Sequence, residues 1–167
     1  MPGLDYSQIP VEKLAEVFAR SIFTVDGLWF LAVEEKYGLE AAVEIDAEVW
    51  RKCGSIFPGR TVRNFAIKDD STIHVLIKAL LLDPFAPIFT PEVTLITDSK
   101  AVFHYANCPG QEARVRDGKG EFPCRAVGMT YFKAYAEAID PGIKVTCLTC
   151  PPDPHPPHIW CEWQFEI

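Results

Sequence analysis

The spacing of apolar residues changes near residue 90, and this change limits the folds that are open to the chain. Before that point, apolar residues recur every three or four positions, which is the period of an amphipathic helix. After it, they alternate with polar residues in short runs, which is the period of a strand. Helices followed by strands favour an α+β domain over a regular alternation of strand and helix.

Three helices are predicted in the first half. Residues 10–52 form two of them: the first is interrupted at Gly27 and closed at Gly38, and the second ends before Gly54 and Pro58. A third helix covers 71–82, with capping residues at 68–72, and the Asp-Pro pair at 83–84 ends it.

The second half predicts four strands and one main helix. Their ranges are 93–97 and 101–106 for a hairpin, 111–116 for a short helical piece, 127–139 for a fourth helix, and 143–149 and 159–167 for the last two strands. The expected fold is therefore a single α+β domain over residues 1–167. Its N-terminal helices pack with a four-stranded antiparallel sheet, and one further helix lies between the strand pairs.

Composition excludes several classes of protein. An apolar fraction of 49% is typical of a globular chain, and a net charge of −7 argues against a nucleic-acid partner. The apolar runs are too short to cross a bilayer, so we expect no membrane partner. The first residues lack the pattern of a secretory signal, and we expect a cytoplasmic protein whose thiols are reduced.

Cysteines cluster in the last third of the chain. Cys147 and Cys150 have the Cys-x-x-Cys spacing that supplies two ligands to zinc or iron, and Cys108 and Cys124 are the expected partners. An iron-sulfur cluster on the same four thiols is the nearest variant. The additional candidate ligands are His155, His158 and Cys161.

Other readings of these cysteines stay open, because free cysteines often fill core volume. The prolines after Cys150 prevent a helix from continuing there, which argues against a thioredoxin-like redox motif. Cys161 shares strand parity with Trp163, Phe165 and Ile167, which places it on the apolar face. Cys53, alone in the helical half, is interpreted as structural.

Candidate pocket residues are Asp26, Trp29 and His104. Carboxylates flank tryptophans in the helical half, and a carboxylate held against a tryptophan can have its pKa raised into a range useful for acid or base chemistry. The alternative is a solvated helix face. Gly27 would permit close approach of a helix or ligand. His104 lies on a strand and is either near Cys108 or a hydrogen-bonded core histidine.

Several short motifs carry a family resemblance. They are Asp-Gly-Leu-Trp-Phe at 26–30, Glu-Glu-Lys-Tyr-Gly at 34–38, Val-Trp at 49–50, Cys-Pro-Gly-Gln-Glu-Ala-Arg at 108–114, Pro-Cys at 123–124 and Cys-Leu-Thr-Cys-Pro at 147–151. With them the chain resembles a prokaryotic family related to aminothiazoline-carboxylate hydrolase-like proteins. It is more distantly similar to 4-vinyl reductase type ligand-binding domains.

The hydrolase relatives would imply opening of a cyclic C=N compound by activated water, with cysteines near the site. The vinyl-reductase-like relatives would imply small-molecule sensing, often as a dimer. The residues that match the recurring cysteines are Cys108, Cys124 and Cys150. No motif in the sequence fixes the catalytic group of the hydrolase.

The sequence is therefore compatible with three functional hypotheses. The first is a metal-binding domain, with zinc or iron beside a small-molecule pocket. The second is a hydrolase, and the third is a ligand-sensing or interaction module with structural cysteines. A homodimer is the default assembly.

Overall fold

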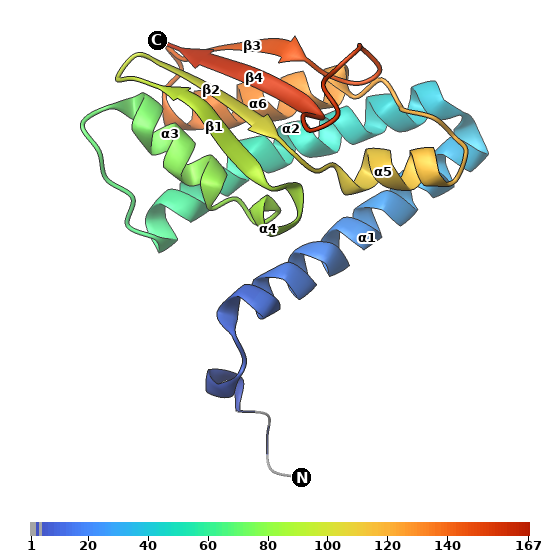
Figure 1. The fold of residues 1–167 in the computed structure, drawn as a ribbon, viewed down its shortest axis with the longest axis horizontal. Coiled ribbons are helices and arrows are strands. Elements are labelled where there is room, and N and C mark those ends of the chain that lie inside the picture. The colour runs from blue at the N-terminus through green and yellow to red at the C-terminus, as the bar shows by residue number, and fades with distance from the viewer. Residues whose placement is uncertain (1–2, 4) are drawn as a thin grey trace.

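The computed structural model describes residue 3 and residues 5–167 of the chain (Figure 1). A short 3-10 turn, η1 (Tyr6–Gln8), precedes six helices and four strands in the described residues. Their bounds are α1 (Val11–Tyr37), α2 (Leu39–Asn64), α3 (Thr72–Leu81), α4 (Ala86–Phe89), β1 (Pro91–Ile96), β2 (Lys100–Tyr105), α5 (Pro109–Arg116), α6 (Arg125–Ile139), β3 (Lys144–Thr149) and β4 (Cys161–Glu166).

The first helix has the predicted ends but no break, and the second helix is longer than the sequence pattern predicted. The turn at Gly38 is as expected, with a φ of 90° that favours glycine. However, α1 runs through Gly27 without a break, and α2 continues past Gly54 and Pro58 to Asn64. Gly54 is a contact point and not a terminator: a Cβ there would lie 2.4 Å from the carbonyl oxygen of Tyr131 on α6. Glycine lets the two helices cross closely.

The third helix follows the prediction. Ser71 caps it, because its side-chain oxygen accepts a hydrogen bond of 3.3 Å from the backbone N–H of His74. Its apolar face, including Ile73, Leu76 and Leu80, is fully buried. The short helix α4, which follows it, was not predicted.

The sheet confirms the predicted fold class. It is antiparallel, with the strand order β1-β2-β4-β3, so the first hairpin and the last strand pair meet where β2 pairs with β4. Phe103, Trp163 and Phe165 point to the inner face and are fully buried in the main core with α6. Gly128 on α6 makes room for them, because a Cβ there would lie 2.5 Å from the Trp163 ring. Ile167, which shares their parity, is half exposed past the end of β4.

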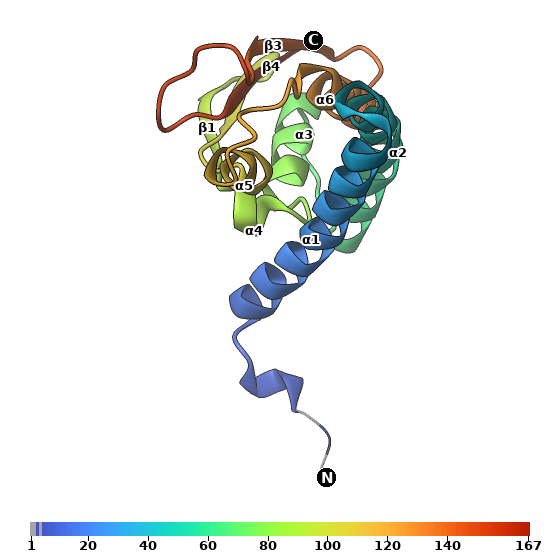
Figure 2. The same ribbon diagram turned by 90° about the vertical axis from the view of Figure 1, so that its right-hand side faces the viewer.

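Helices α6, α3 and α2 lie beneath the sheet, and α1 lies at the outside of the molecule (Figure 2). Only Ala19 of the 27 residues in α1 is buried, and the N-terminal half of this helix leaves the body. None of the helices in the described part of the chain is long and apolar enough to cross a membrane.

Candidate functional site

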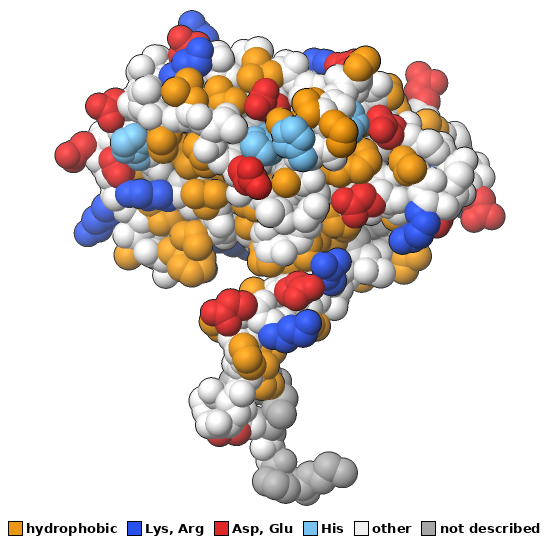
Figure 3. Space-filling view, in the orientation of Figure 1, with side chains coloured by type: hydrophobic (Ala, Val, Ile, Leu, Met, Phe, Trp, Pro, Cys, Tyr) orange, Lys and Arg blue, Asp and Glu red, His pale blue; other side chains and the backbone are white. Residues whose placement is uncertain are grey.

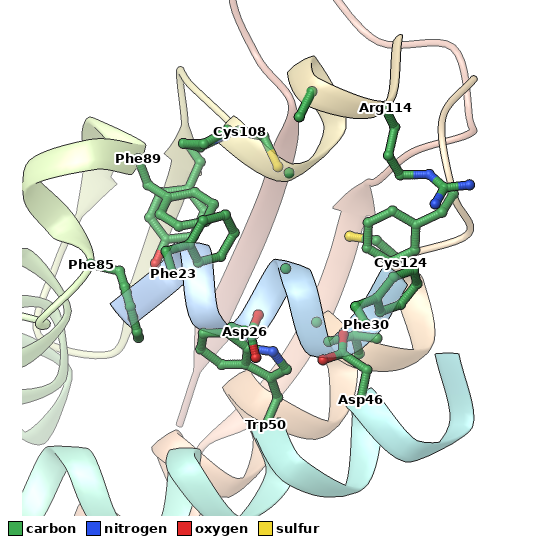
Figure 4. A pocket seen from close by; sticks show the side chains of 18 of the residues that line it. Phe23, Asp26, Phe30, Asp46, Trp50, Phe85, Phe89, Cys108, Arg114 and Cys124 are labelled. Atoms are coloured by element: carbon green, nitrogen blue, oxygen red, sulfur yellow. The ribbon is translucent and has the colours of Figure 1, made fainter. Parts of the chain in front are cut away.

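A cavity of about 460 Å³ lies between α1 and α2 on one side and α5, α6 and the sheet on the other. Side chains from segments far apart in the sequence point into it (Figure 4). Its walls are largely apolar, and aromatic rings from many segments contribute to them. The rings that line it belong to Phe23, Phe30, Trp50, Phe85, Phe89, Tyr105, Phe122, Tyr131, Phe132 and Trp163. A concave apolar site of this size, with a few convergent polar groups, has the dimensions of a small-molecule pocket.

Two carboxyl groups, Asp26 on α1 and Asp46 on α2, lie beside Trp50 in the wall of this cavity (Figure 4). Burial raises the pKa of Asp26 to about 6, and the Trp50 indole N–H partly offsets this. Burial and the neighbouring Asp26 raise the pKa of Asp46 to about 7. Within the described residues, neither group has a lysine, arginine or histidine at ion-pair distance. The pair can therefore hold and release a proton near neutral pH.

A third acid, Asp83, also lines the cavity and is almost fully buried. The Tyr131 hydroxyl donates to its Oδ2 at 2.5 Å, and the backbone N–H of Phe85 donates to its Oδ1 at 3.0 Å. Burial raises the pKa of Asp83 to about 6, although both hydrogen bonds act against the increase. With both oxygens occupied, this group is better suited to positioning Tyr131 than to binding a ligand.

Arg114 closes the rim between α5 and α1. Its guanidinium donates to both carboxylate oxygens of Glu34, at 2.7 Å and 3.2 Å, and it lies over the rings of Phe30 and Phe122. The arginine and its partner are both largely buried. Because its charge is already paired, Arg114 is a structural clasp at the entrance.

Three of the cysteines also line the cavity. They are Cys108 at the start of α5, Cys124 at the start of α6, and Cys161 on β4. Burial raises the pKa of both Cys108 and Cys161 to about 12. These thiols are neutral at physiological pH, and a neutral thiol is a poor nucleophile.

The predicted metal ligands are brought together in part. The Sγ atoms of Cys124 and Cys150 lie 3.4 Å apart, and the pKa of Cys147 is raised well above its usual range mainly by the adjacent Cys150 thiol. Cys108 lies on the cavity wall, apart from the Cys-x-x-Cys turn. Across the described ranges, no set of three or more His, Cys, Asp and Glu side chains has an arrangement that could hold a metal ion.

The histidines and the remaining cysteine have other surroundings. The His155 ring lies against the Trp160 ring in a tilted arrangement, with its Nε2 3.4 Å from Glu121 Oε1, and His158 is exposed. Cys53 packs against the main core.

The three candidate pocket residues have different outcomes. Asp26 lines the cavity, whereas Trp29 points outward and is 71% exposed, because it lies on another face of the same helix. His104 lies on the far face of the sheet from the cavity-lining Tyr105, since neighbouring strand residues alternate. It is buried there, with Nε2 3.3 Å from Glu92 Oε2 in a geometry too poor for a hydrogen bond.

Sequence reasoning missed two parts of this site. Asp83 appeared only as a helix terminator, and Arg114 appeared only in the motif at 108–114 that carries the family resemblance. A buried apolar environment on both sides of Asp83, with Leu80 before it and Phe85 after it, was the available signal. The pairing of Asp26 with Asp46 depends on how α1 crosses α2, which the sequence does not specify.

The fold and cavity together define an α+β domain with an aromatic, acid-containing pocket. Residues 5–167 match the model of a family described as a family of unknown function (DUF6125), and the chain belongs to that family. No curated protein and no solved structure is detectably similar to it.

Proposed function

We propose that this protein binds a small aromatic or heteroaromatic molecule that carries a protonated nitrogen, such as an amine or an amidine. The observation that carries the proposal is the pair of acids without a basic partner, Asp26 and Asp46, in the wall of a cavity rich in aromatic rings. A bound cation would favour the ionised form of both groups. Aromatic faces around it would add cation–π attraction.

Charge distinguishes this ligand class from its rivals. Three cations line the cavity, and each already has a carboxylate partner: Arg114 and Lys119 lie near Glu34, and Arg116 lies near Asp117. An anionic ligand would therefore meet the buried acids and no unpaired cation. A neutral ligand would gain only from the rings. Binding of a cation would therefore strengthen as the pH rises from 5 to 8, because the pKa values of Asp26 and Asp46, about 6 and 7, lie in this range.

Benzamidine, benzamide and benzoate form a matched set of probes with one ring and a positive, neutral or negative substituent. We expect benzamidine to raise the melting temperature and to bind at least tenfold more tightly than the other two in calorimetry at pH 8. Asp26→Asn and Asp46→Asn should each remove this preference. Glu35→Gln, which neutralises an exposed acid on the same helix, should leave it unchanged.

Equal binding of benzoate and benzamidine would contradict the proposal, as would a preference that survives in both asparagine variants.

Hydrolysis of a cyclic C=N compound is a second candidate at the same site. A protonated C=N carbon is attacked by water, and an acid pair with pKa values of about 6 and 7 can take a proton from that water and return it to the departing nitrogen. The high thiol pKa values disfavour a covalent route. Turnover of an aminothiazoline substrate should then survive cysteine alkylation and be lost in Asp46→Asn; the reverse pattern would favour a thiol.

Zinc or iron binding is supported by one observation, the 3.4 Å separation of the Cys124 and Cys150 sulfurs. Two thiolates on one zinc lie roughly 3.8 Å apart, given bonds of about 2.3 Å. A metal site would need Cys147 and Cys108 to close on this pair. Elemental analysis of the purified protein should then show about one metal that is lost in a Cys124→Ser, Cys150→Ser variant; metal-free protein with all thiols titrating would exclude it.

A further inference from the structure

Helix α1 lacks the packing that a helix of its length requires. Tertiary burial of an apolar face supplies most of the stability of protein helices, yet this 27-residue helix buries one residue, Ala19. In a monomer, part of the solvent-facing surface of α1 is strongly apolar. Residues 21–33 contain one charged side chain, Asp26, and it faces the cavity.

The exposed apolar residues of α1 form a regular stripe. Phe18, Ile22, Val25 and Trp29 recur in alternating steps of four and three residues and are between 56% and 71% exposed. This spacing is that of the a and d positions in a coiled coil or four-helix bundle. Where α1 diverges from α2, Phe18 and Ile22 also border an open groove.

Helix α2 repeats the pattern with Ile45, Val49, Lys52 and Ile56, whose apolar members are each nearly half exposed. The relative position of the two stripes follows from the helical hairpin that α1 and α2 form. In each helix the cavity-lining acid comes one residue after a stripe residue: Asp26 follows Val25, and Asp46 follows Ile45. One residue corresponds to a rotation of about 100° around the helix axis. Asp26 and Asp46 lie next to each other beside Trp50, so each acid points toward the other helix. Because the helices are antiparallel, equal rotations away from two facing acids place both stripes on the same side of the α1–α2 pair, and the exposure of the stripe residues shows that this side faces outward.

We propose that a second copy of this chain covers this outer face, defined by Phe18, Ile22, Val25 and Trp29 with Ile45, Val49 and Ile56. Two hairpins related by a twofold axis would place their seams together as an antiparallel four-helix bundle. Large apolar side chains that are about half exposed offer on the order of 100 Å² each, so the seven residues of the two stripes approach the roughly 800 Å² per partner of a stable interface.

The chemistry of the face favours a second copy over a lipid surface. Helices that lie in a membrane interface are rich in Lys and Arg on their polar side. Here, the charges beside the stripes are balanced: Glu48 pairs with Arg51 and Lys52, and Glu16 pairs with Lys13 and Arg20. Elsewhere, charges of both signs are scattered over the face shown in Figure 3.

Sedimentation equilibrium of the full chain tests the proposal. We expect a dimer at micromolar concentration, and Ile22→Glu and Val49→Glu should each weaken it about 100-fold or more, because each buries an unpaired charge at the seam. Val115→Glu, at a similarly exposed apolar position on α5, should leave the dimer intact. Circular dichroism confirms that each variant is folded.

Lys52→Leu is a variant that should strengthen the dimer, an effect that misfolding would not produce. It completes the α2 seam, and the dimer should tighten about tenfold or more. A wild-type monomer at about 100 μM would overturn the proposal, as would a dimer that all three seam variants leave unchanged. A monomer that binds phosphatidylcholine and phosphatidylserine vesicles through Trp29 would assign the face to lipid instead.

Discussion

Two glycines at helix surfaces determine how closely the core layers approach one another. Gly54 lets α2 cross α6, and Gly128 lets α6 approach the Trp163 ring. Neither has a positive φ, so space and not backbone conformation requires glycine. The same residue type therefore has a role here different from its role at the Gly38 turn.

Replacement of Gly54 by alanine should destabilise the protein by about 2–4 kcal/mol, because the added methyl group would overlap the Tyr131 carbonyl and force the helices apart. The measurement is urea unfolding followed by circular dichroism. Gly59→Ala is the matched control in the same helix. It meets open space and should stabilise by up to about 1 kcal/mol through helix propensity alone. Equal effects of the two changes would contradict this account of the crossing.

At the scale of elements, the buried ion pair between Arg114 and Glu34 connects α5 to α1. Removal of one partner leaves the other buried and uncompensated. Arg114→Ala should therefore cost about 3 kcal/mol, with a further loss from its contacts with Phe30 and Phe122. Arg116→Ala, which breaks an exposed pair with Asp117, should change stability by less than about 0.5 kcal/mol.

Thermal melts of the two arginine variants distinguish these roles. A clasp at the cavity entrance also predicts that Arg114→Ala binds benzamidine less tightly, because α1 is then less firmly held. If the two variants have the same melting temperature, the Arg114–Glu34 ion pair contributes no more to stability than a surface contact.

The element pattern was largely available from the sequence, whereas helix ends and the site were not. Periodicity predicted α3, α6 and the four strands because their apolar residues recur with the period of a helix or of a strand. Gly54 and Pro58 were wrongly interpreted as terminators: both lie inside α2, and Gly54 is needed there because α6 crosses it closely. The sequence likewise indicated acids beside tryptophans, but only the crossing of α1 and α2 selects Asp26, Asp46 and Trp50.

At the scale of the whole molecule, buried acids should give an unusual dependence of stability on pH. The pKa values of Asp26, Asp46 and Asp83 rise from 3.8 to about 6, 7 and 6 in the folded state. The folded state therefore binds more protons than the unfolded state between pH 4 and pH 7. Stability should fall as pH rises through this window and then level off.

Asp46→Asn tests this dependence, because the amide keeps the shape of the side chain and removes its ionisation. The variant should be more stable than the wild type by roughly 1–2 kcal/mol at pH 8 and no more stable at pH 5. Urea titrations at both values measure the difference. Glu35→Gln serves as the exposed control. If Asp46→Asn gains the same stability at both pH values, ionisation of Asp46 is not the cause of the pH dependence.

Helix α1 is a wall one helix thick. Asp26 and Phe30 face the cavity, while Val25 and Trp29, one position before each, face outward. A ligand in the cavity that changes the tilt of α1 must also change the position of the apolar stripe on the outer side of the same helix. Ligand occupancy and pairing of two copies would then be coupled equilibria, each altering the affinity of the other by the same factor.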